Sequence, residues 1–225
     1  MIRSVLFDTE TTGLDPLTGD RVIEVAALEL INDLPTCNHF HALIDPKRDI
    51  QADATRIHGI SNADVAGKPL FAAIAADLLA FMGEGKLIAH NAPFDFGFLN
   101  AEFSRIGMPS LPAARMVDTL ILAKQRFPGM PNSLDALCRR FAIDLTARTT
   151  HNALLDCKLL ADVYVELTGG RQRGLSLAAN NGRAPVAVYT HAGARTPRLF
   201  QPDAADLAAH DAFVGKLKDS VWSMP

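Results

Sequence analysis

The sequence has little cysteine, no long apolar run and no excess of positive charge. Its three cysteines (Cys37, Cys138 and Cys157) are odd in number and lack metal-ligand spacing, which argues against a disulfide framework and favours a reducing, cytoplasmic setting. No apolar run approaches the roughly 20 residues that span a bilayer, so we expect no membrane partner. The first residues, MIRSVLFD, lead directly into a predicted strand and show no signal-peptide pattern.

The charge is spread unevenly along the chain. The formal net charge is −3; residues 169–225 carry seven Lys/Arg against four Asp/Glu, whereas residues 1–168 carry 15 against 21. An acidic body argues against tight binding along a nucleic-acid duplex. It still permits a nucleic-acid substrate if bound metal ions neutralise the carboxylates at the site itself. The pattern therefore favours a weak hold on a strand end.

The hydrophobic pattern predicts an α/β domain with a mixed five-stranded sheet in residues 1–170. Strands come first and then alternate with helices, which is typical of this fold class. The predicted strands are Ser4–Asp8, Val22–Ile31, His39–Ile44, Lys86–Ala89 and Met116–Asp118, and the predicted helices are Leu70–Met82, residues 91–105, Thr119–Arg126, Leu134–Phe141 and Asn152–Leu167. We expect residues 171–201 to be a flexible linker. Residues 202–225 form a separate tail segment, with helical spacing over 203–218.

Four acidic residues and one histidine stand in three short motifs. Asp8 and Glu10 belong to FDTETTGLDP, Asp95 to HNAPFDFGFL, and His151 and Asp156 to HNALLDCKLLAD. Carboxylates gathered in one place repel each other unless a cation lies among them, and their oxygens suit Mg²⁺ and Mn²⁺. We therefore predict two divalent metal ions, Mg²⁺ or Mn²⁺, at a site that hydrolyses a phosphodiester, with the histidine as proton acceptor.

Each motif alone has a simpler explanation. Asp8 and Glu10 would be solvated acids of a surface turn, although two residues apart in an extended chain they project to one side. Asp95 lies in the first turn of its helix, where the helix dipole stabilises any carboxylate. His151 and Asp156 are about 140° apart around a regular helix, so they meet only if the histidine lies at the helix entrance.

The three motifs in this order, D-x-E, H-N-x-x-F-D and H-x4-D, resemble those of the DEDDh class of 3′–5′ exonucleases, whose fold is similar to that of ribonuclease H. The resemblance covers residues 2–170. It implies that Asp8, Glu10, Asp95 and Asp156 bind the metal ions and that His151 is the general base. We expect substrate contacts from residues in or near the motifs: Thr9, Thr11, Gly13, Leu14, His58, Asn91 and Phe94.

Within this class, FPGMPNSLDALCRRF and RTTHNALLDCKLLADVYVELTGG are similar to the proofreading epsilon subunits of bacterial DNA polymerase III. The resemblance implies removal of mispaired nucleotides from a single-stranded or frayed DNA 3′ end as 5′-monophosphates. It also implies that the tail binds the polymerase III alpha subunit. The expected contacts are the large apolar residues of the tail: Leu207, Phe213, Leu217 and Trp222. Asn152, where glycine is expected, departs from the pattern, as does a longer, Arg-bearing stretch after Gly170.

A short motif follows the predicted domain. Residues 172–177, QRGLSL, match Q-x-x-L-x-L and resemble the peptide by which proteins bind the bacterial sliding clamp. Gln172 would form hydrogen bonds, while Leu175 and Leu177 would fill an apolar groove. Motifs this short also arise by chance.

Two other functions are open at this point. One is an RNA-directed exonuclease of the same class, acting on oligoribonucleotides or tRNA ends, against which the tail argues. The other is a catalytically inactive scaffold that joins clamp and polymerase, against which the five intact catalytic positions argue. The rate on single-stranded DNA relative to RNA distinguishes the first alternative from a DNA exonuclease. Metal-dependent release of nucleotide distinguishes an active enzyme from the inactive scaffold.

Overall fold

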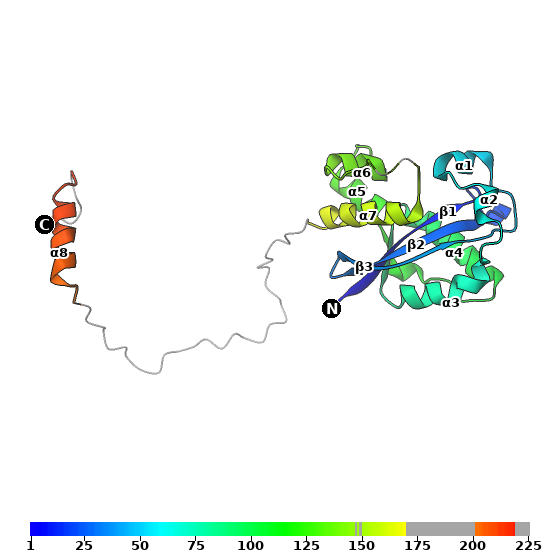
Figure 1. The fold of residues 1–225 in the computed structure, drawn as a ribbon, viewed down its shortest axis with the longest axis horizontal. Helices are drawn as coiled ribbons and strands as arrows, with labels where there is room; N and C mark the ends of the chain where they lie inside the picture. The colour runs from blue at the N-terminus through cyan, green and yellow to red at the C-terminus, as the bar shows by residue number, and fades with distance from the viewer. Residues whose placement is uncertain (147, 149, 170–200, 219–225) are drawn as a thin grey trace, which may run out of the picture. The chain divides into compact units, whose positions relative to one another are not determined.

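The computed structural model describes residues 1–146, 148, 150–169 and 201–218, and its centre is a five-stranded mixed sheet in the order β3-β2-β1-β4-β5 (Figure 1). The strands are β1 (Arg3–Thr11), β2 (Val22–Ile31), β3 (Leu34–Leu43), β4 (Lys86–Ala89) and β5 (Met116–Asp118). β1 pairs antiparallel with β2, and β2 with β3, whereas β1, β4 and β5 run parallel. The carboxyl ends of the three parallel strands therefore meet at one edge of the sheet.

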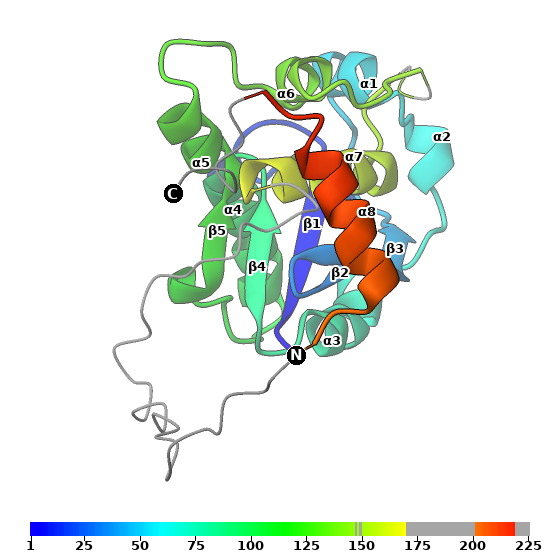
Figure 2. The same cartoon turned by 90° about the vertical axis from the view of Figure 1, so that its left-hand side faces the viewer.

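Helices cover both faces of the sheet, with α7 above it and α3 below it in Figure 1. Figure 2 shows the strands side by side, from β5 on the left to β3 on the right. One core packs α3 (Phe71–Met82) and α4 (Ala92–Arg105) against alternate β1 residues such as Phe7. The other core packs α5 (Thr119–Arg126), α6 (Leu134–Arg140) and α7 (Ala153–Leu167) against residues such as Leu6. Neighbouring strand residues point to opposite faces, so β1 contributes to both cores.

The predicted mixed α/β sheet flanked by helices is confirmed, but two of the predicted strands were too short. β1 runs to Thr11 because it remains paired with β2 as far as Thr11 and Val22, so Asp8 and Glu10 lie within the strand. β3 begins at Leu34, where it continues the hairpin with β2. The sequence prediction missed two short helices, α1 (Ala52–His58) and α2 (Asn62–Val65), and two turns of 3₁₀ helix at Pro16–Thr18 and Ala113–Arg115.

The helix starts agree with the predictions to within one residue. Ser133 and Asn152 occupy cap positions and accept hydrogen bonds from the backbone N–H groups of Ala136 and Leu155. Asn91 also precedes its helix, yet its backbone is left-handed (φ 64°) and its side chain makes no capping hydrogen bond. Its backbone N–H instead donates to Asp118 Oδ1 at 3.0 Å, which ties the end of β4 to the end of β5.

The chain divides into two units, residues 1–175 and 176–225, and the described helix of the second is α8 (Ala204–Val214). α8 is shorter than the predicted 203–218. Leu207, Phe213 and Leu217 are 47%, 60% and 41% exposed. The other predicted tail contacts (Gln172, Leu175, Leu177 and Trp222) lie outside the described residues, and the boundaries 1–170, 171–201 and 202–225 stay predictions. No helix in the described part of the chain is both long and apolar enough to span a bilayer.

Candidate active site

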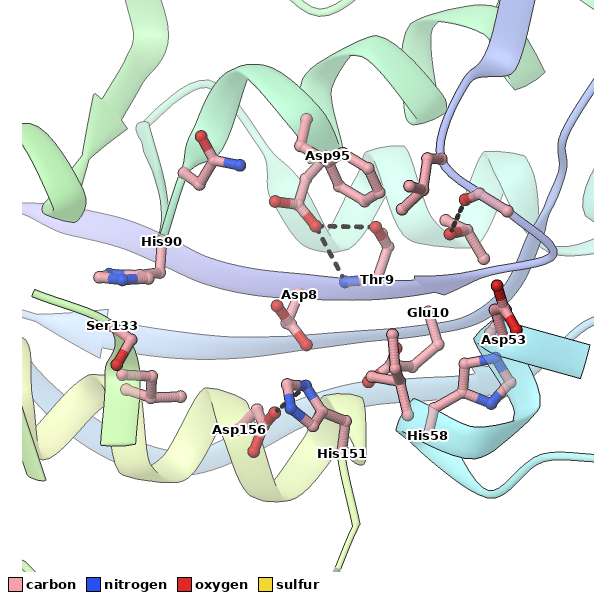
Figure 3. Close-up of a pocket in the computed structure, with 18 of the residues that line it drawn as sticks. Asp8, Thr9, Glu10, Asp53, His58, His90, Asp95, Ser133, His151 and Asp156 are labelled. Atoms are coloured by element: carbon pink, nitrogen blue, oxygen red, sulfur yellow. Dashed lines mark hydrogen bonds and ion pairs between the residues drawn. The ribbon is translucent and has the colours of Figure 1, made fainter. Parts of the chain in front are cut away.

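The four predicted acids and the histidine line one cavity of about 670 Å³ at the carboxyl edge of β1 (Figure 3). Asp8 and Glu10 come from β1, Asp95 from α4 and Asp156 from α7. In Figure 3, Asp8 lies between Asp95 on one side and Asp156 on the other. Segments up to 148 residues apart in sequence thus bring their carboxylates together, as the motifs predict.

Strand β1 fixes the carboxylate contributed by α4. Thr9 donates to Asp95 Oδ1 twice, from its backbone N at 3.1 Å and from its Oγ1 at 2.7 Å. Asp95 lies in the first turn of α4 and is 3% exposed. Thr9 therefore holds this carboxylate inside the cavity, in addition to the stabilisation that the helix dipole gives it.

The start of α7 is anchored by a buried acid on β2. Glu24 accepts hydrogen bonds from Asn152 Nδ2 at 3.1 Å and from the backbone N of Ala153 at 3.2 Å, and it lies 2.6 Å from His41 Nε2. His151 immediately precedes this anchored cap, and its backbone N donates to Ile57 O at 3.2 Å. The histidine lies at the helix entrance, and its Nδ1 is 3.6 Å from Asp156 Oδ2.

Burial and mutual repulsion make the acid cluster costly to ionise. Burial, followed by repulsion from Asp95, Glu10 and Asp156, raises the pKa of Asp8 well above its usual value. Burial and the charge of Glu24 raise the pKa of Glu10 to about 8. Burial raises the pKa of Asp95 to about 7, although the hydrogen bonds from Thr9 oppose the shift. A cluster of this kind gains most from a bound cation.

The donor atoms suit hard divalent ions. One ligand atom each from Glu10, His151 and Asp156 lie within 4.8 Å of one another, and Asp8 and Asp95 add carboxylate oxygens in the same cavity. Carboxylate oxygens are the ligands that Mg²⁺ and Mn²⁺ prefer. The residues therefore fit the predicted metal ions.

His151 has the environment of a neutral imidazole. Burial, and then the charge of Arg148, lower the pKa of His151, while Asp156 and Asp135 oppose the shift. Its side chain is 48% exposed and can be reached from the cavity. A neutral imidazole at pH 7 and above can accept a proton.

All seven predicted substrate residues line the cavity: Thr9, Thr11, Gly13, Leu14, His58, Asn91 and Phe94. Both hydroxyls in this set already form hydrogen bonds, since Thr9 donates to Asp95 and Thr11 donates to Gly13 O at 2.6 Å. A Cβ at Gly13 would overlap the Asp20 carboxylate and the Gln51 amide, which explains a glycine there. Contact with substrate remains a prediction for all seven.

His58 is the last residue of helix α1. It is 4% exposed, and its Nδ1 accepts a hydrogen bond from Ile60 N at 3.0 Å. Gly59, in the left-handed conformation, ends α1 immediately after the histidine.

Sequence reasoning missed two further site residues, Glu24 and Arg148. Glu24 lies directly opposite Glu10 and is 1% exposed, and an acid within a largely apolar predicted strand was a usable signal. Arg148 precedes His151 by three residues and bonds to Asp156 with its guanidinium. No sequence pattern indicated that contact, because it depends on how the loop before α7 folds back.

Comparison with known proteins decides the family. The exonuclease family of the RNase T type matches residues 5–164. DNA polymerase III subunit epsilon of Rickettsia conorii is 44% identical over 228 residues, covering 98% of this chain and 99% of its own length. The chain belongs to the DNA polymerase III epsilon-subunit family. The epsilon subunit of Escherichia coli is 36% identical over 223 residues, covering 93% of this chain and 91% of its own.

Solved structures agree with this assignment. Exonuclease X, in complex with 5′ overhanging duplex DNA, is 28% identical with a TM-score of 0.59, covering 75% of this chain and 91% of its own. The nuclease domain of 3′hExo, a DEDDh family member bound to rAMP, shares the fold with a TM-score of 0.62 at 19% identity, covering 76% of this chain and 94% of its own. The predicted epsilon resemblance is confirmed, and the chain is a 3′–5′ exonuclease.

Proposed function

We propose that this epsilon-family chain is the proofreading 3′–5′ exonuclease of a replicative DNA polymerase III. The observation that carries the proposal is the convergence of Asp8, Glu10, Asp95 and Asp156 with His151 in one cavity. A cavity of about 670 Å³ has room for a terminal nucleotide. The product would be a deoxynucleoside 5′-monophosphate.

The four carboxylates would hold two divalent ions, Mg²⁺ or Mn²⁺. Such ions, when bound, supply an activated water and stabilise the leaving oxygen. Thr9 holds the Asp95 carboxylate in place, and Glu24 holds the start of α7. Because both contacts already hold these groups in place, the site needs little reorganisation when substrate binds.

His151 would accept the proton from the attacking water. Its lowered pKa keeps the imidazole neutral at the pH of the cell, and its half-exposed ring can pass the proton on to solvent. His151→Ala should therefore lower the turnover number in saturating metal. A turnover number near that of the wild type would show that another group takes the proton.

The edge of the cavity offers apolar side chains to the terminal bases. Leu14 is 78% exposed and Ile57 is 50% exposed, and both line the cavity together with Phe94. Bases can stack or wedge against such groups without regard to sequence. A terminal nucleotide must leave its stack to reach the acids, which costs least when it is mispaired or single-stranded.

We further propose that residues 171–225 hold the enzyme at its partners. The exposed apolar side chains Leu207, Phe213 and Leu217 of and after α8 suit the polymerase alpha subunit, and residues 172–177 suit the sliding clamp. Such tethers raise the effective concentration of a domain whose net negative charge favours only weak DNA binding. Acting on the chromosome beside these partners, the enzyme would be cytoplasmic.

The proposal is tested by initial rates on three primers of one sequence: a DNA duplex with a mispaired 3′ end, the same duplex fully paired, and the single strand as RNA. The expected order has the mispaired DNA fastest. Equal rates on mispaired and paired ends would support general end trimming, and a preference for RNA would support the RNA-directed alternative.

A further inference from the structure

Arg148 occupies both oxygens of one of the four acids. Its Nε lies 2.6 Å from Asp156 Oδ1 and its Nη2 lies 2.7 Å from Asp156 Oδ2, a two-point contact of a guanidinium with a carboxylate. The third nitrogen, Nη1, lies 2.6 Å from Asp135 Oδ1 on α6. The side chains of Arg148 and Asp156 are only 8% and 5% exposed, so solvent screens this contact little.

No other described Lys or Arg lines the cavity. The guanidinium therefore supplies fixed positive charge to a group of acids that otherwise repel one another, and it lowers the pKa of Glu10 against the effect of burial. A divalent ion bound at Asp156 needs at least one of the two oxygens to which Arg148 now donates. Two cations at one carboxylate also repel each other, so the arginine and the metal ion compete for Asp156.

Asp135 is a second carboxylate partner of Arg148. Its carboxylate is 41% exposed on α6, outside the ring formed by Glu10, His151 and Asp156. Nη1 contacts Asp135 while Nε and Nη2 contact Asp156, so a guanidinium that loses Asp156 still has a charged partner on α6. Asp135 is therefore suited to retain the guanidinium when a metal ion takes Asp156.

We propose that Arg148 is an exchangeable counter-ion, which neutralises Asp156 before metal binds and yields that carboxylate to the incoming ion while it remains on Asp135. The inference rests on the proposed metal site. Arg148 would then lower the metal affinity of the site, because the ion can bind Asp156 only after the Arg148–Asp156 contact has been broken. The competition should weaken metal binding by about tenfold, which corresponds to about 1.4 kcal/mol.

The test is Mn²⁺ binding without DNA, measured from the electron paramagnetic resonance signal of free Mn²⁺. Arg148→Gln should bind Mn²⁺ about tenfold more tightly than the wild type. Arg148→Lys keeps the charge but loses the two-point contact, so its affinity should fall between the two. The matched control is Arg139→Gln, which removes the same charge from an exposed position on α6 and should stay within about twofold of the wild type.

The melting temperature supplies a second readout. In EDTA at pH 8, Arg148→Gln should melt below the wild type because Asp156 loses its cation, and saturating Mn²⁺ should remove most of the difference. Unchanged or weaker Mn²⁺ binding by Arg148→Gln would overturn the inference, since a competitor cannot be removed without a gain in affinity. If that variant does not fold, unchanged or weaker binding by Arg148→Lys overturns it equally.

The wild type and Asp8→Ala/Glu10→Ala, measured side by side, separate the two proposals. If the wild type binds no Mn²⁺ beyond the double variant, the proposed metal site itself fails. If the wild type binds Mn²⁺ and the Arg148 variants bind it no more tightly, the metal site stands and only the role of Arg148 fails.

Discussion

Thr9 holds Asp95 through two hydrogen bonds to a single carboxylate oxygen, one from the backbone N and one from Oγ1. The contact joins the central strand to the helix on one face of the sheet, 86 residues further along the chain. It lies directly beside Asp8 and Glu10, so the residue between the two strand acids positions the third acid. The DTE sequence thus contributes three residues to the site.

Removing the Thr9 hydroxyl should loosen Asp95 without disturbing the strand. Thr9→Val keeps the shape of the side chain and the backbone hydrogen bond, but loses a hydrogen bond to a carboxylate that is worth about 1.5–3 kcal/mol. We expect kcat/KM to fall by about tenfold and the Mg²⁺ concentration for half-maximal rate to rise. Thr9→Ser, which keeps the hydroxyl, is the control and should retain most of the activity. A Thr9→Val enzyme as active as Thr9→Ser would show that the hydroxyl does not position Asp95.

Substitution of Glu24 should lower both the unfolding free energy and the turnover number. Glu24→Ala leaves the Ala153 N–H and the Asn152 amide without their buried acceptor, which costs about 1–3 kcal/mol of unfolding free energy. It should also lower the turnover number, because His151 immediately precedes the freed helix start. Urea unfolding and steady-state rates check both effects.

The matched control for Glu24 is Glu29→Ala on the same strand, which removes a more exposed ion pair with Arg3. It should change the unfolding free energy less and leave the turnover number unaltered. Equal losses of activity in the two variants would mean that disruption of β2 in general, and not the anchoring of α7, lowers the rate.

Without metal, stability should fall as the pH rises from about 6.5 to 8.5. The pKa of Glu10 is raised from 4.5 to about 8 and that of Asp95 from 3.8 to about 7, so the folded state holds protons that the unfolded state has already lost. The resulting stabilisation is present at low pH and disappears as the pH passes the folded-state pKa values. Burial lowers the pKa of His58 and His90. These histidines make stability rise with pH, but only below about pH 6.5.

Thermal melts in EDTA at pH 6.5, 7.5 and 8.5 measure this slope. Glu10→Gln, which cannot ionise, should flatten it, and saturating Mg²⁺ should offset the loss in the wild type because the ion favours the ionised acids. A melting temperature in EDTA that rises with pH over this range would show that the acids are not repelling one another in the folded protein.

Buried apolar segments made much of the fold predictable. The boundaries of β2, β4, β5 and α5 agree with the sequence prediction, since each is a compact run between clear turn or capping residues. Helices α1 and α2 were missed because each buries a single residue, His58 and Val65, and so shows no apolar periodicity. In these short helices, local capping and turn geometry determine the structure.

The site residues that lie within the three sequence motifs were predictable. Asp8 and Glu10 could be placed together from strand geometry alone, and the order of the motifs indicated the remaining acids and His151. The Arg148–Asp156 contact was not predictable, because it depends on the path of the loop before α7. The Glu24 anchor likewise joins residues 129 apart, and no local pattern encodes that pairing.

The most direct test of the central claim is nucleotide release from a 3′-mispaired DNA primer by the wild type and by Asp8→Ala/Glu10→Ala, each with Mg²⁺ and with EDTA. The account predicts 5′-monophosphate from the wild type in Mg²⁺ only, and none from the double variant. Release that persists in EDTA, or in the folded double variant, would contradict a metal-dependent exonuclease site built on these two acids.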